Sequence, residues 1–484
     1  MYFKQKSNVI YRDYGSFGYI TDNRNFGYKF SNNYEEDIGD RVVSETGAIF
    51  LSALSRSPQS IDILSEKIGR HFQGVDTEVI KHDAINFYLE LEDSGFIVSG
   101  ESFEECSNRD KRLSSQKPKE QRRDNVHEHK EDINNTWNFL DDYFEGEPQL
   151  VSLHIEITSK CNKRCIHCYI PHEKKTEIMS PHMFYDILEQ AREMNLLHLT
   201  ISGGEPLGHD SFVDFLKKCN EYNFSVNVLS NLTLLSREII QEMKNNPLLC
   251  VQTSLYAMDA DVHDAITQKK GSFNKTKSAI LELIQNDIPV QISCPIMKQN
   301  IHYYKEVIQW GKAHNINVAN DYVIIAKYDH STQNLCCRLS IDDVCKIINQ
   351  SIDDDSQYLI TMEKEYEQKM GMTKDDYICS VCQSSLCISE NGNVYPCAGW
   401  QDYVLANINE IKLSDIWNKS DKVKYLRNLR RSDFPKCVQC SEKEFCTMCM
   451  VRNANENPQG DPLKVNQYFC DIARINKEIY FKRR

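Results

Sequence analysis

Strand-like and helix-like patterns alternate along residues 148–335 of this chain. Apolar positions predict strands in six segments, at residues 150–157, 197–201, 225–229, 251–255, 290–295 and 318–325. Helical spacing predicts helices between them, at residues 180–194, 211–222, 236–245 and 272–286. Such alternation indicates an α/β fold with a parallel sheet, whose active site lies at the carboxyl ends of the strands.

Residues 1–100 have a different pattern and are predicted to form a small separate domain. Short alternating segments near residues 8–11, 18–20 and 27–30 predict a three-stranded sheet. Three helices are expected to follow, beginning after the capping residues Ser44, Ser60 and Asp76. Residues 95–98 then close the unit.

Residues 101–147 are predicted to be a charged flexible linker followed by a short helix. From Ser102 to about Asn135 almost every residue is polar, so this stretch cannot bury enough apolar surface to offset the entropy lost on ordering. Cys106, in its first part, is interpreted as a bystander thiol. Aromatic residues from Trp137 to Phe144 then predict the helix.

Charge and cysteine content narrow the class of protein. The 484-residue chain has a net charge of −13, which argues against a nucleic-acid-binding surface. No signal peptide is recognisable and no run of 18 apolar residues occurs, so we expect a cytoplasmic protein without a membrane partner. In such a compartment the 19 cysteines indicate metal ligands more readily than disulfides.

Cys161, Cys165 and Cys168 follow the first predicted strand with C-x3-C-x2-C spacing. Three thiolates on one short loop can converge on one metal centre. A cubane iron–sulfur cluster has four irons to ligate, so three cysteines leave one iron open to a group that is not protein.

A second motif, Gly203-Gly204-Glu205-Pro206, follows the second predicted strand. Two glycines allow a backbone to approach a ligand closely, and a carboxylate can accept a hydrogen bond from an ammonium group. The two motifs, in this order and at this distance, resemble those of the radical SAM enzymes. A structural zinc knuckle beside an unrelated glycine turn is the alternative.

The resemblance implies a partial (β/α)6 TIM-like barrel over residues 148–335. In the family, S-adenosyl-L-methionine binds the open iron of a catalytic [4Fe-4S] cluster, the GGEP segment holds its amino group, and an electron from the cluster gives a 5′-deoxyadenosyl radical. By position, the further cofactor contacts are expected to be His167 against adenine, and Ser230, Asn231 and Ser254 at strand ends.

Nine more cysteines lie after residue 372: Cys379, Cys382, Cys387, Cys397, Cys437, Cys440, Cys446, Cys449 and Cys470. Their spacing resembles the SPASM domain, which carries two auxiliary [4Fe-4S] clusters. The resemblance implies that Cys437, Cys440, Cys446 and Cys470 bind one cluster. Cys379, Cys397 and Cys449 would bind the other, with Cys382 expected as the fourth ligand and Cys387 left as a competing thiol. A pair of zinc sites is the alternative.

The SPASM-like region is expected over residues 372–484, after a helical bridge at residues 336–371. A hairpin is predicted around the Asn391-Gly392 turn. The order of elements in residues 1–100 resembles the winged-helix-like PqqD-like domain, which implies capture of a leader peptide at a sheet edge. A DNA-binding winged helix is disfavoured because this segment has 10 Lys plus Arg against 15 Asp plus Glu.

Together the three parts resemble maturases of ribosomally made peptides, closest to thioether-forming sactipeptide and PapB-type ranthipeptide maturases. The implied reaction joins a cysteine sulfur to an acceptor carbon of a precursor peptide, with electrons from a donor such as a flavodoxin or ferredoxin. Carbon–carbon cross-linking, epimerisation and sulfatase-type formylglycine formation share these motifs and remain alternatives. A non-catalytic iron–sulfur or zinc scaffold is the alternative outside enzymes.

Overall fold

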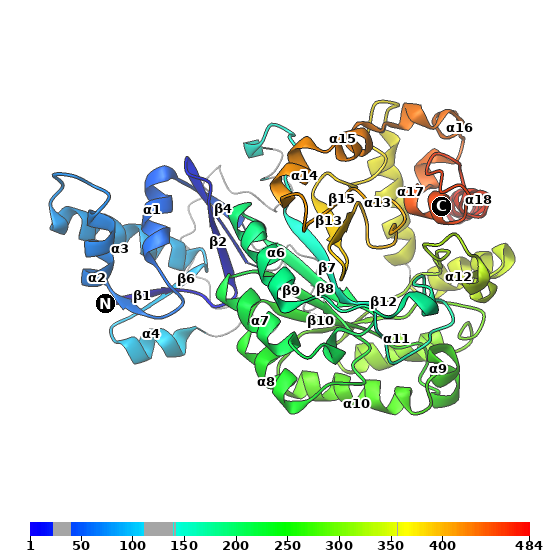
Figure 1. Cartoon of the computed structure of the whole chain (residues 1–484), viewed down its shortest axis with the longest axis horizontal. Helices are drawn as coiled ribbons and strands as arrows, with labels where there is room; N and C mark the ends of the chain where they lie inside the picture. Colours follow the sequence, from blue (N-terminus) through cyan, green and yellow to red (C-terminus); the bar gives the residue numbers. More distant parts are fainter. Residues whose placement is uncertain (23–39, 111–138, 140–141, 356) are drawn as a thin grey trace.

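The computed structural model describes residues 1–22, 40–110, 139, 142–355 and 357–484. An N-terminal unit (blue in Figure 1) lies at one end of the molecule, beside a barrel-like α/β body (green), and a C-terminal unit (orange and red) covers one side of that body. None of the helices described is long and apolar enough to cross a membrane.

The N-terminal unit contains two small sheets and a group of helices. Strands β2 (Val9–Asp13), β3 (Phe17–Asp22) and β4 (Asp40–Ser44) form one antiparallel sheet, and β5 (Gln59–Ser60), β1 (Tyr2–Gln5) and β6 (Ile97–Gly100) form the other. The strand expected near residues 27–30 lies outside the described residues.

The predicted capping residues begin the three expected helices. The side chains of Ser44, Ser60 and Asp76 accept backbone hydrogen bonds at the starts of α1 (Glu45–Ala53), α2 (Ile61–Gly69) and α3 (Thr77–Asp93). These helices share one hydrophobic core with the sheets.

The prediction that a flexible linker begins at residue 101 is wrong. Residues Phe103–Arg109 form helix α4, and Cys106 in it is fully buried. A side chain at Gly100 would meet the Cys106 backbone nitrogen at 2.5 Å, so glycine permits this close packing. The ion pair between Lys4 and Asp110 (2.5 Å) holds the segment that follows. The ordered unit therefore continues to residue 110, because one buried thiol and local capping compensate for a polar sequence. The rest of the expected linker, residues 111–138, lies outside the described residues.

Six parallel strands form the partial barrel that the sequence predicts. Their order is β12-β11-β10-β9-β8-β7. The bounds are β7 Ser152–Thr158, β8 His198–Gly203, β9 Ser225–Leu229, β10 Leu249–Ser254, β11 Val290–Ser293 and β12 Asn317–Ala319. The helices between them are α6 Pro181–Glu193, α7 Phe212–Glu221, α8 Arg237–Asn245, α9 Ala260–Thr267, α10 Ser272–Gln285 and α11 Tyr304–Ala313. Helices α9 and α11 were not expected.

A helical bridge and the C-terminal unit complete the chain. The bridge consists of α12 (Ile341–Asp354) and α13 (Gln357–Met370). The predicted hairpin is formed by β13 (Ser385–Ile388) and β14 (Asn393–Tyr395), followed by β15 (Ala406–Asn407). The remaining helices are α14 Leu413–Lys419, α15 Asp421–Asn428, α16 Pro435–Val438, α17 Met450–Asn455 and α18 Gln467–Arg483.

Strand β13 joins the C-terminal unit to the barrel sheet. It pairs in parallel with β7, so that Cys387 lies opposite His154 and the sheet extends to nine strands. No sequence pattern indicated this pairing, which connects residues more than 200 positions apart. It places the cysteine-rich unit directly beside the first strand of the barrel.

Alternate positions on the barrel strands face opposite sides of the sheet. Leu153 and Ile155 are buried in the main hydrophobic core, with the apolar residues of β8 to β10. On the other face one row of register partners crosses five strands. We call this the lumen row; it consists of Cys387, His154, Thr200, Asn227 and Cys250. Polar side chains therefore line the inside of the barrel at this level.

Candidate active site

The first cysteine motif forms a loop after β7. Cys161, Cys165 and Cys168 are each partly buried in it. The backbone nitrogen of Ile166 donates to the carbonyl of Ile266 (3.0 Å), which attaches the loop to the end of α9. Burial, followed by the nearby thiol of Cys168, raises the pKa of Cys165 to about 11. The thiols of the motif are therefore close enough to interact.

The spacing of these sulfurs suits a cluster better than a single ion. A tetrahedral zinc site with Zn–S bonds of about 2.3 Å requires sulfurs about 3.8 Å apart. Among the described residues, no group made of cysteines alone brings three sulfurs within 4.8 Å of one another. A cubane needs wider separation because each cysteine binds a different iron. The three thiols therefore lack the close spacing of a zinc site, a spacing that a [4Fe-4S] cluster does not require.

Hydrogen-bond donors surround two of the sulfurs. The Lys175 ammonium donates to Cys168 Sγ (3.4 Å), and the backbone nitrogen of Lys163 donates to Cys161 Sγ (3.5 Å). The Asn231 amide also approaches Cys161 Sγ, at 4.0 Å. Donors of this kind stabilise thiolate ligands and influence the reduction potential of a cluster.

The two glycines of the GGEP motif pack against the backbone at the start of the cysteine loop. A Cβ at Gly203 would lie 2.0 Å from the Thr158 carbonyl oxygen, and one at Gly204 would lie 2.3 Å from that of Lys160. Gly203 also has a φ of +131°, a conformation that side chains disfavour. The expected reason for these glycines was close approach to a ligand; the structure shows close approach of two loops.

Glu205 links the motif to the end of β9. Its buried carboxylate accepts hydrogen bonds from the Leu207 nitrogen (3.1 Å), the Ser230 hydroxyl (2.6 Å) and the Asn231 nitrogen (2.8 Å). Burial raises the pKa of Glu205, and these hydrogen bonds oppose that effect. Oε2 accepts only the bond from Asn231 among the described residues, so it can accept another from an ammonium group. Pro206 is buried directly after it.

The other expected cofactor contacts lie around the same loop. Asn231 donates to the Asn162 side chain (2.9 Å), and therefore joins the end of β9 to the cysteine loop. His167 Nε2 lies 2.9 Å from the hydroxyl of Tyr256, and burial lowers the pKa of His167 to about 4, so its ring is neutral at pH 7. Ser254, the last residue of β10, bonds to the same tyrosine. Sequence reasoning missed Tyr256, although its position two residues after Ser254 was a signal.

A buried polar group below the loop was also missed. Glu156 on β7 accepts hydrogen bonds from the Tyr169 hydroxyl (3.1 Å) and from the Gln401 side chain, while His154 bonds to Ser202. Burial, and then the nearby Glu390, raises the pKa of Glu156 to about 8. The sequence signal for this group was the alternation of polar and apolar residues in β7, in which His154 and Glu156 stand between apolar neighbours.

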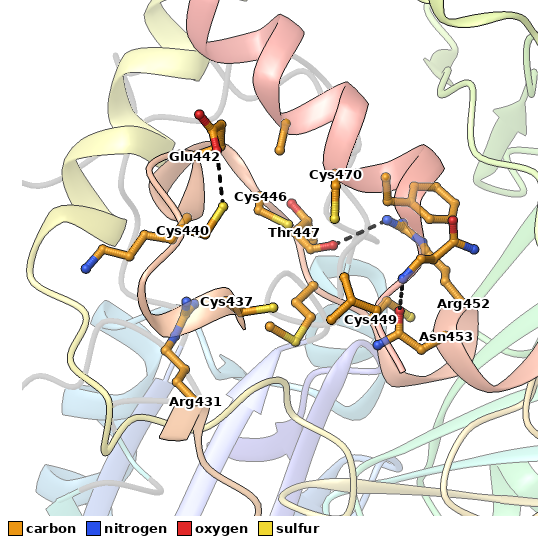
Figure 2. Close-up of a pocket in the computed structure, with 16 residues that line it drawn as sticks. Arg431, Cys437, Cys440, Glu442, Cys446, Thr447, Cys449, Arg452, Asn453 and Cys470 are labelled. Atoms are coloured by element: carbon orange, nitrogen blue, oxygen red, sulfur yellow. Dashed lines mark hydrogen bonds between the residues drawn. The ribbon is translucent and has the colours of Figure 1, made fainter. Parts of the chain in front are cut away.

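One set of C-terminal cysteines surrounds a cavity. The sulfurs of Cys437, Cys440, Cys446 and Cys470 point toward this common space, which is also lined by Arg431 and by Cys449 (Figure 2). Burial, and then the thiols of Cys470, Cys437 and Cys440, raises the pKa of Cys446 to about 11. These are the four residues expected to bind one auxiliary cluster.

The second C-terminal set lies near the barrel. The thiols of Cys379, Cys397 and Cys449 interact with one another, and Cys382 interacts with Cys379 and Cys397. Cys387 has Glu156 as its main charged neighbour and Cys397 of this set as the next. Cys382 thus interacts with two thiols of the set, whereas Cys387 interacts with one and lies in the lumen row.

Comparison with known families identifies two domains. Residues 155–311 match the model of the Radical SAM superfamily, and residues 379–442 match SPASM, an iron–sulfur cluster-binding domain. The chain therefore contains a radical SAM domain and a SPASM domain. Its first domain binds S-adenosyl-L-methionine and a [4Fe-4S] cluster, and its SPASM domain binds auxiliary iron–sulfur clusters.

Two curated relatives and one solved structure resemble the chain. The AdoMet-dependent heme synthase of Methanosarcina barkeri is 23% identical over 63% of this chain and 92% of its own length. The antilisterial bacteriocin subtilosin biosynthesis protein AlbA of Bacillus subtilis is 25% identical over 64% and 69%. The crystal structure of Streptococcus suis SuiB bound to precursor peptide SuiA shares the fold, with a TM-score of 0.59, 15% identity and coverage of 96% and 99%.

Proposed function

We propose that this chain is a peptide maturase that forms thioether cross-links between a cysteine sulfur and an acceptor carbon of a ribosomally made precursor peptide. The observation that carries the proposal is the parallel pairing of β13 with β7. This pairing brings the Cys379, Cys397 and Cys449 set to the edge of the barrel whose strand ends carry the Cys161, Cys165 and Cys168 loop. An auxiliary cluster bound by this set would lie beside the space in which a substrate radical would form and could accept its electron.

The lumen supports a peptide as the substrate. The side chains of the lumen row include an imidazole, a hydroxyl and an amide, which suit the polar backbone of a peptide. Among the relatives, AlbA acts in subtilosin biosynthesis and other related proteins are PqqA peptide cyclases. SuiB was solved with its precursor peptide. Another relative is named an AdoMet-dependent heme synthase.

The N-terminal unit is proposed to bind the leader of the precursor as a PqqD-like domain. In the sheet β2-β3-β4, the outer strands each pair on one side only among the described residues. A leader peptide could therefore add as a further strand. Arg12 of β2 donates hydrogen bonds to the Leu196 carbonyl (2.7 and 2.9 Å), so this sheet is fixed to the start of β8.

The residues of the chain would bind, position and shield the reactants. When bound, S-adenosyl-L-methionine and its cluster supply the chemistry that removes a hydrogen atom from a substrate carbon, with an auxiliary cluster as acceptor of the surplus electron. Glu205 would hold the ammonium group, and His167 with Tyr256 would lie against the adenine. The substrate loses one hydrogen from carbon and one from sulfur as the carbon–sulfur bond forms. A flavodoxin or ferredoxin would donate electrons, and the site of action would be the cytoplasm.

The test is incubation of the anaerobically reconstituted protein with S-adenosyl-L-methionine, a reductant and a cysteine-rich precursor peptide with its leader. We expect a product lighter by two hydrogens per cross-link. After treatment with iodoacetamide, tandem mass spectrometry should show that the linked cysteines are not alkylated. The control protein carries Cys161→Ala, Cys165→Ala and Cys168→Ala.

Loss of two hydrogens with every thiol still reactive would contradict thioether formation and indicate a carbon–carbon link instead. An unchanged mass with inverted stereochemistry would indicate epimerisation. Failure to form 5′-deoxyadenosine, together with bound zinc and no iron, would favour the scaffold alternative.

A further inference from the structure

His154, Glu156 and Cys387 meet on one face of the sheet, where β7 and β13 run side by side. Cys387 and His154 are register partners, and Glu156 is two residues further along β7, on the same face. Glu156 and Cys387 are almost completely buried, and His154 is partly buried. The group borders the second C-terminal set, because Cys387 and Glu156 both interact with Cys397.

The ligand atoms of these three residues have the spacing of a single ion. One nitrogen of His154, one carboxylate oxygen of Glu156 and the sulfur of Cys387 all lie within 4.8 Å of one another. No other group of three such side chains in the described part of the chain meets this condition. Nitrogen, oxygen and thiolate donors together favour Zn²⁺ or Fe²⁺ over Mg²⁺ and Ca²⁺, which prefer oxygen ligands.

Neighbouring side chains fix the direction of two of the donors. Glu156 accepts hydrogen bonds from Tyr169 and Gln401, and His154 bonds to Ser202. Ligating carboxylates and imidazoles in metal sites are held by such bonds, which orient them before the ion arrives.

The charge around Glu156 also favours a cation. The charged neighbour that acts on it most strongly is another acid, Glu390. Within the residues that the structure describes, no Lys or Arg forms an ion pair with Glu156. Without an ion the Glu156 carboxyl is therefore mostly protonated at pH 7, and a divalent cation would displace this proton and provide the positive charge that the pocket lacks.

We propose that His154, Glu156 and Cys387 form a mononuclear binding site for one divalent transition-metal ion, for which Zn²⁺ is the probe. The site lies between the barrel lumen and the Cys379, Cys397 and Cys449 set, and it is distinct from the iron–sulfur clusters. Three protein ligands leave a position for a further donor from water or substrate.

The test measures metal content, which does not depend on activity. Fully iron-loaded protein is equilibrated with a small excess of Zn²⁺ and desalted, and both metals are determined by mass spectrometry. We expect about one zinc beside about twelve irons per chain, the number for three cubane clusters. His154→Gln and Glu156→Gln should each reduce zinc at least tenfold and leave the iron content unchanged.

Matched controls come from the same lumen. His198→Gln changes another buried imidazole, and Cys250→Ser changes another thiol of the lumen row; both should retain the zinc. X-ray absorption at the zinc edge should show one sulfur ligand, which Cys387→Ser removes.

Two outcomes would overturn the proposal. One is zinc retention in both His154→Gln and Glu156→Gln. The other is loss of about four irons in Cys387→Ser with zinc unchanged, which would make Cys387 a cluster ligand instead. If Cys387→Ser does not fold, the two glutamine variants still decide the question.

Discussion

The ammonium group of Lys175 donates a hydrogen bond to Cys168 Sγ over 3.4 Å. It brings a positive charge to one edge of the site of the catalytic cluster. Reduction adds negative charge to a cluster, so a nearby cation favours the reduced form.

Lys175→Met should therefore lower the reduction potential of the catalytic cluster. We expect a shift on the order of 60 mV, the change that corresponds to a factor of ten for one electron. Electron paramagnetic resonance during a redox titration measures this potential. The signal of the catalytic cluster is isolated either by spectral resolution or by replacing the cysteines of the auxiliary clusters. Lys174→Met is the control, and an equal shift in both variants would count against the hydrogen bond.

Gly204→Ala should separate the GGEP segment from the cysteine loop. The new Cβ would lie 2.3 Å from the Lys160 carbonyl oxygen, so one of the two backbones must move. We expect loss of the catalytic cluster's iron and a stability decrease of at least about 2 kcal/mol. Iron analysis and thermal unfolding measure these effects. Gly208→Ala, which meets only the flexible end of Leu234 at 3.3 Å, should retain full iron.

Arg12→Met should loosen the N-terminal unit from the barrel. The buried guanidinium donates to the carbonyls of Leu196 and Asn223, and its removal leaves these acceptors without a charged donor. We expect a cost of about 3 kcal/mol and faster hydrogen exchange in residues 9–13 and 195–198. Arg70→Met is the control, because Arg70 follows α2 and forms an exposed ion pair with Glu66; it should change neither region. Unchanged exchange in Arg12→Met would show that other contacts dominate the docking.

Stability should fall in acid partly through His263. Its Nδ1 accepts a hydrogen bond from the Tyr256 nitrogen (3.3 Å), and burial lowers the pKa of His263 from 6.5 to about 3. The unfolded chain therefore binds this proton at a higher pH than the folded chain. The contribution is fully present above pH 6.5 and is lost as pH falls from 6.5 toward 3, by at most about 1.4 kcal/mol per unit.

His263→Asn keeps an acceptor near the Tyr256 nitrogen but cannot take up a proton in this range. Unfolding midpoints at pH 7, 6 and 5 should therefore fall less in this variant than in the original protein. His82→Asn, on an exposed side chain, is the control. Parallel curves for His263→Asn and the original protein would contradict the assignment.

Local sequence signals predicted most of the elements correctly. Ser44, Ser60 and Asp76 begin helices because their side chains bond to backbone nitrogens in the next turn, an interaction within four residues. The helix at Phe103–Arg109 was missed because its polar sequence has too few apolar positions to show a period. Its contacts with β6 are the buried Cys106 and the hydrogen bond from Arg109 to the Ser99 carbonyl. The helix propensity of the residues alone cannot predict such a tertiary contact.

The roles of site residues were predicted less completely. The spacing of Cys161, Cys165 and Cys168 was sufficient to indicate a cluster because all three lie on one short loop. Tyr256 and Gln401 were missed because each reaches its partner, His167 or Glu156, from a distant part of the chain.

By itself, the sequence determined the chemistry available to this protein: three cysteine sets, a GGEP turn and strands whose alternate residues are polar. The tertiary structure decided which of these groups meet. Only the parallel pairing of β13 with β7 places Cys387 beside His154 and Glu156. Strand pairing over such a distance depends on the shape and hydrogen bonding of the whole sheet, and no local pattern encodes it.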